Sequence, residues 1–488
     1  MTTPTRPEIA SCDARPPGRL RPWPVVVAVA CAALSVAACG VGPRYRRPET
    51  PVPAQWVEAN PTAPGHWPAA DWWHGFGSAD LDALLDRAHR ANDDIGAAVA
   101  RVREADAQRR IAGAALLPSV TAGGTAVRER APVSGAGYQT YDQYVPLLTV
   151  GYEFDFWGKN RAAYTAARAA AAASRYDHVT VELTVLTSVA TTYFQVLELR
   201  DRVAIAEANL ESATHILRGL SLEKEVGTAT ALDVAQQETV AATLNASIPP
   251  LRQQLRQATD ALAILVGGTP DTLEIASGTL EGLTAPAVSP GLPSELLTRR
   301  PDVAEAEADL VAANANVAAA RAAFFPSISL TGTGGFESGA LATLLTPASR
   351  IWSLGAGITQ PIFEGGALRG QSEYAKARYS ELVAGYHKAV ISAFGNVEDA
   401  LSEVRQTSDQ LEREQHAVDR AQRAYEIAQA QLRAGTINVL TLLNTETALF
   451  SARDALAQVK LARLQAALDL FKALGGGWQQ GGGGAGSQ

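Results

Sequence analysis

Apolar residues recur every seven positions along residues 366–434, a stretch that contains no proline. The seam advances by four or three residues, and once by seven, through Val390, Phe394, Val397, Leu401, Val404 and Leu411. Such a repeat predicts a long helix that packs against other helices. At 1.5 Å per residue the helix would be roughly 100 Å long, which is far more than a globular domain requires. This length favours a role in crossing a distance.

A second proline-free stretch, residues 158–226, has the same kind of seam, formed by Leu199, Val203, Ala206, Leu210, Ala213 and Leu217. A glycine turn ends each long helix, at Gly227 and at Gly435, and a shorter helical pattern follows each turn. We expect the first return helix to be broken at Pro249-Pro250 and to resume as far as residue 266, because proline in a helix interior removes a hydrogen bond. Further helices are predicted over residues 81–117, 302–325 and 438–474.

Four segments alternate between apolar and polar residues with a period of two, which predicts β-strands. They cover residues 119–128, 144–156, 327–336 and 352–359. The polar segment 129–142 is expected to form a loop between the first two strands. A strand of a soluble β-sandwich shows the same alternation. Here, however, each strand is about ten residues long and aromatic residues gather at strand ends, which is typical of strands that cross an outer membrane.

Several motifs occur twice in the chain. Pro118-Ser119 precedes the first predicted strand and Pro326-Ser327 the third, and Gly227-Thr228 and Gly435-Thr436 both lie at helix turns. Both pairs are separated by 208 positions. A long fixed offset of this kind indicates an internal duplication.

These patterns divide the chain into six parts. We expect a signal peptide (1–38), an extended N-terminal segment rich in Pro and Trp (39–80), a first repeat (81–266), a linker (267–298), a second repeat (299–474) and a disordered Gly-rich tail (475–488).

The first forty residues have the pattern of an export signal. Arg15, Arg19 and Arg21 precede an apolar run at residues 25–38, which is too short to span a bilayer as a helix. The run ends in Val36-Ala37-Ala38-Cys39, which resembles a bacterial lipoprotein box; a plain signal peptide with a chance cysteine is the alternative. The resemblance implies a diacylglycerol and an N-acyl chain on Cys39. Gly40 in place of Asp implies retention at the outer membrane.

The composition excludes some classes of function. The formal net charge of −8 gives no basic face for nucleic acid. The seven histidines are scattered and the three cysteines lack zinc-ligand spacing, so neither a metal site nor a catalytic constellation is predicted. We therefore expect a protein that is not an enzyme and needs no cofactor beyond the lipid.

Four membrane strands cannot close a barrel, and an open sheet edge is not tolerated in lipid. The protein should therefore oligomerise. Two copies would give a barrel of about eight strands with a filled interior, and three would give about twelve strands and a lumen. The long helices would continue such a barrel into the periplasm.

Several separated motifs match one known family. Leu292-Pro293-Ser294-Glu295-Leu296-Leu297 is followed by Arg299-Arg300-Pro301-Asp302-Val303, and Trp72-Trp73 with Phe76 and residues 154–158 add to these. Together they resemble the TolC-like outer-membrane efflux lipoproteins of the NodT type. The resemblance implies an α+β membrane protein: a homotrimer with a 12-stranded transmembrane β-barrel, four strands per chain, and a long periplasmic α-helical barrel.

The same resemblance implies the partners and the function. It implies a passive exit duct that carries drugs or other small toxic compounds from a periplasmic membrane-fusion adaptor and an inner-membrane proton-driven pump to the outside. The adaptor would meet the two helix turns, Val226-Gly227-Thr228 and Ala434-Gly435-Thr436, giving six similar grooves in a trimer. The plainer interpretation is that each glycine only supplies the backbone freedom of a helix end.

Three residues beside the turns are candidates for a gate at the periplasmic mouth: Asp233, Arg433 and Asn444. The family often has an acid where this chain has Asn444, so an acidic ring is in doubt. Two alternatives remain open. One is the exit channel of a type I protein-secretion system, and the other is a lipid-tethered periplasmic coiled-coil scaffold. Small or polar lumen candidates, Glu153, Ser329, Thr331 and Thr359, would select weakly, so cargo choice is expected to rest with the pump.

Overall fold

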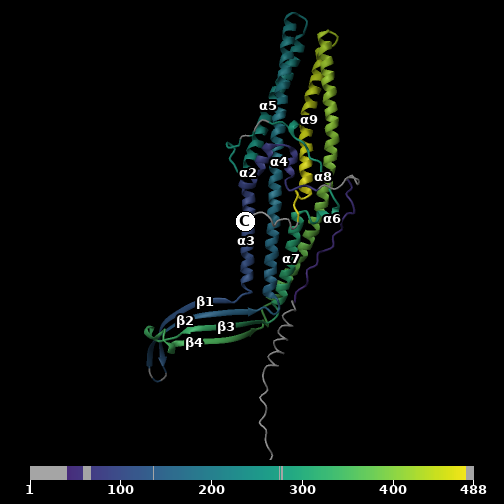
Figure 1. The fold of residues 1–488 in the computed structure, drawn as a ribbon. Helices are drawn as coiled ribbons and strands as arrows, with labels where there is room; N and C mark the ends of the chain where they lie inside the picture. Colours follow the sequence, from purple (N-terminus) through teal and green to yellow (C-terminus); the bar gives the residue numbers. More distant parts are fainter. Residues whose placement is uncertain are drawn as a thin grey trace, which may run out of the picture. The chain divides into compact units, whose positions relative to one another are not determined.

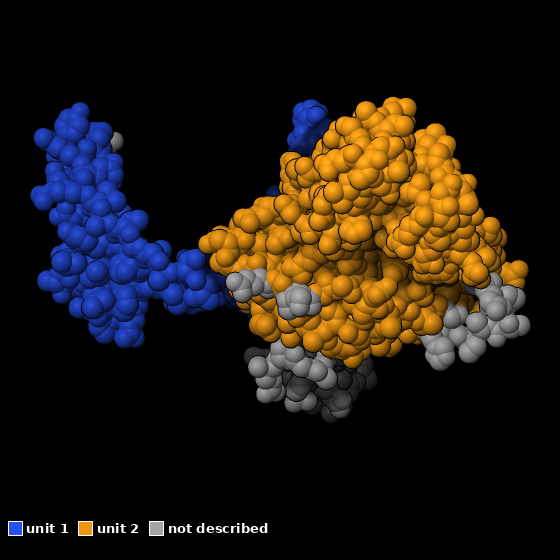
Figure 2. Space-filling view, turned by 90° about the horizontal axis from the view of Figure 1, so that it is seen from above, with its two compact units in different colours: residues 1–42, 116–161, 318–368 blue, residues 43–115, 162–317, 369–488 orange. Residues whose placement is uncertain are grey.

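A computed structural model of the chain describes residues 41–58, 67–133, 135, 137–273, 275, 278–288 and 290–479 (Figure 1). The predicted signal peptide, Cys39 and most of the glycine-rich tail lie outside the described residues. The chain forms two compact units, coloured separately in Figure 2. Of the described residues, unit 1 holds 41–42 and those within 116–161 and 318–368, and unit 2 holds those within 43–115, 162–317 and 369–479.

Unit 1 contains a single antiparallel sheet in the order β1-β2-β3-β4. The strands are β1 (Ser119–Val133), β2 (Gly137–Phe154), β3 (Ser327–Phe336) and β4 (Arg350–Thr359). Two short 3-10 turns, η3 (Leu341–Thr343) and η4 (Pro347–Ser349), lie between β3 and β4. Because β2 pairs with β3, the two halves of the duplicated chain share one sheet.

The prediction of a loop over residues 129–142 was wrong, because most of this segment extends the β1–β2 hairpin. Polar cross-strand pairs hold the extension together. The Tyr141 hydroxyl donates to Glu129 at 2.7 Å, and Arg128 lies 3.6 Å from Asp142 in the directly opposite position. A strand whose two faces are both polar has no period-two apolar signal, so its sequence looks like a loop.

Unit 2 is helical, and its elements repeat at a fixed offset. The long helices α4 (Lys159–Glu225) and α8 (Ala367–Arg433) have 67 residues each, and the return helices α5 (Ala231–Leu265) and α9 (Val439–Ala473) have 35 each. The helices that precede the strands, α3 (Asp93–Ala114) and α7 (Pro301–Ala322), have 22 each. Every one of these boundaries recurs 208 positions later, which confirms the predicted duplication.

Shorter elements complete unit 2: η1 (Trp72–Phe76), α2 (Ala79–Ala91), η2 (Leu280–Gly282) and α6 (Pro293–Leu296). The single helix predicted over residues 81–117 is two helices, because Asn92 ends α2 and caps α3. Its side chain accepts hydrogen bonds from the amides of Asp94 and Ile95 and donates to Leu265. Within the described residues, no helix combines the length and low polarity needed to cross a membrane.

The predicted break at Pro249-Pro250 was wrong, because α5 is continuous through both prolines. Ile248 is buried directly before them, and Leu251 and Leu255 pack against the core directly after them. Packing on both sides therefore outweighs the lost backbone hydrogen bonds. The start of the tail also differs from the expectation of disorder: residues 475–479 are described, and Trp478 packs edge-on against Tyr176.

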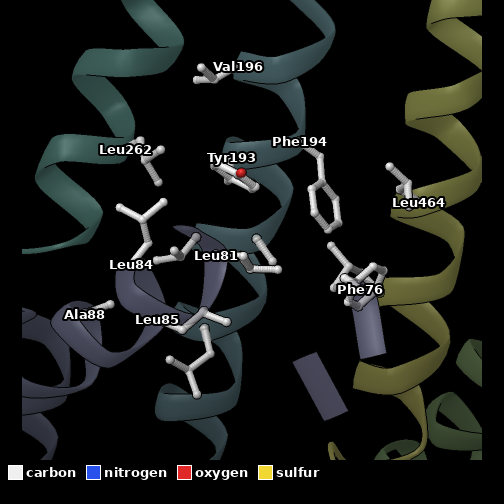
Figure 3. Close-up of a cluster of buried hydrophobic side chains, with 14 of the residues drawn as sticks. Phe76, Leu81, Leu84, Leu85, Ala88, Tyr193, Phe194, Val196, Leu262 and Leu464 are labelled. Atoms are coloured by element: carbon white, nitrogen blue, oxygen red, sulfur yellow. The ribbon is translucent and has the colours of Figure 1, made fainter. Parts of the chain in front are cut away.

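Two hydrophobic clusters hold the middle of unit 2. In the first, Phe76 packs against Phe194 of α4 (Figure 3). In the same cluster, Trp72 stacks on Phe471 of α9. The second includes the predicted seam of α8, in which Val390 and Val397 are fully buried. The heptad pattern thus identified the face of each long helix that packs.

Candidate functional site at the helix turns

The two turns that join the long helices to their return helices have the same geometry, and both lie at one end of unit 2 (Figure 1). Gly227 and Gly435 have φ of 84° and 70°, the left-handed region that glycine favours. The amide of Thr228 donates to Glu223 at 2.8 Å, and that of Thr436 donates to Gln431 at 2.9 Å. Each long helix thus ends in a Schellman motif.

The threonine hydroxyls reinforce both motifs. Thr228 Oγ1 and Thr436 Oγ1 each donate to the same carbonyl as their own amide, at 3.0 Å in both turns. Val226 is 76% exposed and Ala434 is exposed as well. The six predicted docking residues therefore form two matching surfaces: the glycine and threonine fix the turn, and the remaining residue stands in solvent.

The starts of the return helices differ between the repeats. In α5, Thr230 and Asp233 form a capping box: each side chain accepts from the other's backbone amide, at 3.2 and 2.8 Å. The Thr230 hydroxyl also donates to Asp233, and these bonds lower the pKa of that carboxyl. In α9, Asn438 caps alone, by accepting from the amide of Thr441.

The three gate candidates lie near these caps. Asp233 uses one carboxylate oxygen within its own helix start, while Arg433 and Asn444 are exposed. The apolar side chains of Leu220, Val234, Val439 and Leu443 form a small cluster that joins the two helical hairpins beside the turns. Asp233 and Asn444 directly adjoin two members of this cluster in the chain, Val234 and Leu443.

Sequence reasoning missed a buried polar pair one layer further from the turns. Gln237 of α5 and Glu446 of α9 are both 0% exposed, and Gln237 Nε2 lies 3.5 Å from Glu446 Oε2. Burial raises the pKa of Glu446 to about 7, and the hydrogen bond from Gln237 lowers it by less. The available signal was an acid on the apolar face of α9, flanked by leucines three and four positions away.

A cavity of about 550 Å³ lies between α4, α5 and α9, and its lining includes Thr447, the residue that follows Glu446. Its wall combines apolar side chains with hydroxyls and the ion pair between Arg202 and Asp454, whose atoms lie 2.6 Å apart. Among the described residues, no group of three or more acidic, histidine or cysteine side chains is arranged to hold a metal ion.

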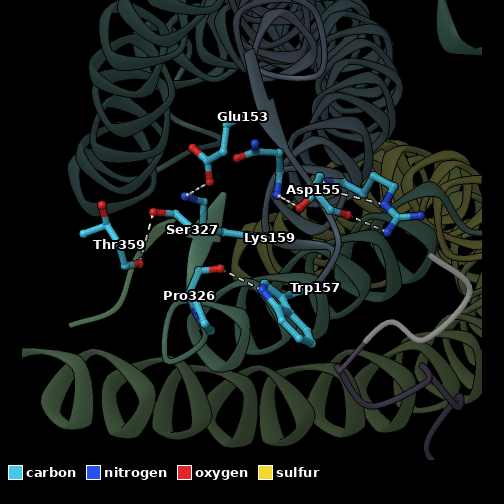
Figure 4. Close-up of polar contacts among 9 residues, drawn as sticks. Glu153, Asp155, Trp157, Lys159, Pro326, Ser327 and Thr359 are labelled. Atoms are coloured by element: carbon cyan, nitrogen blue, oxygen red, sulfur yellow. Dashed lines mark hydrogen bonds and ion pairs between the residues drawn. The ribbon is translucent and has the colours of Figure 1, made fainter. Parts of the chain in front are cut away.

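The motif at residues 154–158 links the repeats within unit 1 (Figure 4). Asp155 accepts from the amides of Asn160 and Arg161 and so caps α4. Trp157 donates to the carbonyl of Pro326 at 2.7 Å. Glu153, a lumen candidate, pairs with Lys159 at 2.6 Å. The motif therefore has a structural role at the junction of strand and helix.

The signature at residues 292–303 is also structural. Trp67 donates to Glu295 at 2.7 Å and lies under the guanidinium of Arg299. Arg300 is buried and donates hydrogen bonds from two nitrogens to the carboxylate of Asp302. It also donates to the carbonyl of Ala473 in the last turn of α9. These contacts attach the N-terminal segment to α6 and Arg299, and the end of α9 to the start of α7.

A four-stranded sheet and paired long helices, each built from two repeats, define an outer-membrane channel subunit of the TolC-like fold. The family model described as outer membrane efflux protein matches residues 84–268 and 292–476, one copy in each repeat. The chain belongs to this family, whose members are transport channels of the bacterial outer membrane that extend into the periplasm and are not enzymes.

Individual relatives agree with this assignment. The chain is 42% identical over 460 residues to the pyoverdine export outer membrane protein OpmQ of Pseudomonas aeruginosa, covering 92% of this chain and 96% of that protein. It is 34% identical over 464 residues to the toluene efflux pump outer membrane protein TtgF of Pseudomonas putida, covering 91% and 96%. The solved OprN channel superposes with a TM-score of 0.85 at 28% identity, covering 91% and 100%. The protein is the outer-membrane channel of a tripartite efflux system.

Proposed function

We propose that three copies of this chain form one passive duct, each copy contributing its four-stranded sheet. The observation that carries the proposal is that, among the described residues, β1 and β4 each have only one neighbouring strand. Unpaired edges are not stable in lipid. Three sheets joined edge to edge would give about twelve strands and leave a lumen, whereas two would give about eight and a filled interior. Apolar side chains exposed on β4, among them Trp352 at 82%, favour contact with lipid or with a neighbouring copy.

The test is the mass of the full-length protein in detergent, combined with single-channel conductance after reconstitution. We expect a mass of three chains and a discrete conductance. A monomer or dimer without conductance would contradict the duct and would favour the tethered scaffold.

We propose that Cys39 carries a diacylglycerol and an N-acyl chain. The residues before it, Val36-Ala37-Ala38, and the Gly that follows it support this assignment. Intact mass of the exported protein should show the lipid and the loss of residues 1–38. Cys39→Ser should remove the added mass and slow the appearance of the protein in the outer membrane. An unmodified cysteine in the mature wild-type protein would contradict the proposal.

We propose that the two turns are the docking surface for a periplasmic adaptor, which connects the duct to a proton-driven pump. The exposed Val226 and Ala434 at the two matching turns support this role. Replacing both with Asp should abolish cross-linking to the adaptor without changing the assembled mass. Gln410→Asp, at an exposed position of α8 about 25 residues from the turn, is the matched control and should cross-link normally. Equal cross-linking in all variants would contradict docking at the turns.

We propose that Asp233, Arg433 and Asn444 contribute to contacts that close the mouth at rest. The exposure of Arg433 and Asn444 in a single chain leaves them available to a neighbouring copy. Arg433→Ala should raise the resting conductance, and an unchanged value would remove Arg433 from the gate.

We propose that the cargo is a small molecule of the siderophore class rather than a protein. Identities of 42% and 37% to two pyoverdine export proteins, compared with 34% to a toluene exporter, support this cargo. Deleting the gene should leave the siderophore inside the cell and lower its concentration in the medium. Unchanged siderophore export combined with a lost secreted protein would favour the type I secretion alternative.

A further inference from the structure

A carboxyl group is enclosed where the two helical hairpins meet. Glu446 of α9 is completely buried, and the residues three and four positions away on either side, Leu442, Leu443, Leu449 and Phe450, are buried as well. Positions at these spacings share one face of a helix. Glu446 therefore interrupts the apolar seam by which α9 packs.

The contacts of this carboxyl connect both hairpins. Gln237 of α5 donates to the carbonyl of Ala213 in α4 at 2.9 Å and reaches Glu446 Oε2 at 3.5 Å. Glu446 Oε1, Gln237 Oε1 and Asn209 Oδ1 have no hydrogen-bond partner among the described residues. An ionised carboxylate with one long hydrogen bond is strongly disfavoured in such a place. A neutral carboxyl fits better, because its O–H adds a donor where unpaired acceptors lie.

In the part of the chain that the structure describes, no buried countercharge offsets this burial. The pKa of Glu446 is raised by burial and lowered only by Gln237, with no contribution from a charged group. From α8, the buried Tyr425 faces the hairpin contact, and its hydroxyl is shared with Ser212 and Gln429. Other titratable side chains of the four helices here are exposed or half-buried: Glu211, His215, Glu238, Arg423, Glu426 and Arg453.

Water can reach the neighbourhood of the carboxyl. The cavity of about 550 Å³ is bordered by Asn209, by Thr447, which follows Glu446 in the chain, and by Phe450, one turn further along α9. Glu446 itself does not line the cavity, but its neighbour Thr447 does, so a small local opening of the packing lets a proton reach the carboxyl without unfolding the helices.

We propose that Glu446 is a proton-operated latch: the neutral acid keeps the α4–α5 and α8–α9 hairpins packed, and its ionisation draws in water and separates them near the turns. This regulation rests on the proposed duct function. The packed state keeps its proton at a pH where a solvated glutamate has lost it, so packing is favoured at low pH. Opening then becomes easier as pH rises from the ordinary pKa of 4.5 to about 7, and changes little above that.

The test is the resting conductance of the full-length wild-type channel in planar bilayers between about pH 5 and about pH 8. The ratio of open to closed channels should rise with pH, by up to about 300-fold over the whole transition. Glu446→Gln, which keeps the shape and cannot ionise, should stay closed and lose the pH dependence. Glu238→Gln is the matched control, because Glu238 occupies the equivalent position 208 residues earlier and is exposed. It should behave as the wild type.

A second measurement does not depend on any variant. Hydrogen exchange of the α9 amides in the wild-type protein, corrected for the intrinsic effect of pH, should accelerate over the same pH range. A conducting wild-type channel that shows no pH dependence would overturn the latch and leave the duct intact. The same pH response in Glu446→Gln as in wild type would also overturn it.

Discussion

Replacing Trp56 with Ala should release the N-terminal segment from the helices. The indole is 6% exposed, lies 6.0 Å from the ring of Phe394 and donates to the carbonyl of Gly291 at 2.7 Å. Truncating a buried Trp to Ala costs about 3–5 kcal/mol, because a cavity remains and buried contacts are lost. Other contacts that hold residues 43–58 include the bonds of Arg47 and Tyr45 to Glu307, and those of two backbone amides to Glu398. The lost free energy should therefore appear as detachment of this segment alone.

Limited proteolysis measures this detachment directly. Every 1.4 kcal/mol is a factor of ten, so cleavage within residues 43–58 should become about 100-fold to several thousand-fold faster. Trp56→Phe keeps most of the packing and loses the hydrogen bond, so it should fall in between. Val57→Ala is the control: Val57 is 85% exposed, and its amide keeps the contact with Glu398. Equal cleavage of Trp56→Ala and wild type would refute the reasoning.

Three further predictions concern stability. Gly475→Ala should lower the melting temperature more than Gly435→Ala. Both glycines have positive φ, but of the two only Gly475 would place a new Cβ against a backbone oxygen, at 2.0 Å. Equal decreases in melting temperature would contradict this reasoning. Thr230→Ala should cost about 1 kcal/mol at the start of α5, seen as faster amide exchange there. Because Thr230 lowers the pKa of Asp233, the stability that the cap contributes should be complete above the ordinary pKa of 3.8 and should be lost as pH falls through the lowered pKa of Asp233. A cap that acid does not weaken would contradict the capping box. Because burial raises the pKa of Glu446, the free energy of unfolding of the wild type, measured with denaturant, should fall by about 3 kcal/mol between about pH 4.5 and about pH 7. The free energy of unfolding of Glu446→Gln should not change with pH over this range.

Much of the helical architecture could be predicted because it is written in local patterns. The heptad seams and proline-free lengths located α4 and α8 to within a residue or so. The period-two pattern located β3 with the correct ends. The predictions that failed depended on contacts with residues distant in sequence, or on polar contacts that a hydrophobic periodicity does not reveal. The outer half of the β1–β2 hairpin is held by polar pairs, and α5 persists through its prolines because of packing on both sides.

The site was partly accessible from sequence. The two glycine turns could be predicted from the repeated Gly-Thr pairs, because a left-handed backbone conformation at a helix end favours glycine. The roles of Trp67, Glu295 and Arg300 as fasteners needed the structure, because their partners lie in other helices. Glu446 needed it too, because a glutamate in a helix is ordinarily solvent-exposed and only the packed hairpins show that it is enclosed.

The N-terminal segment has a consequence for the order of events during folding. Trp56 and Val57 find their partners 235 and 341 positions later, at Gly291 and Glu398. During folding, residues 43–58 therefore cannot take up their final position until α8 has formed. Contacts so distant in sequence form late, because the loop they close is long. A docked N-terminal segment therefore shows that the second repeat has already formed.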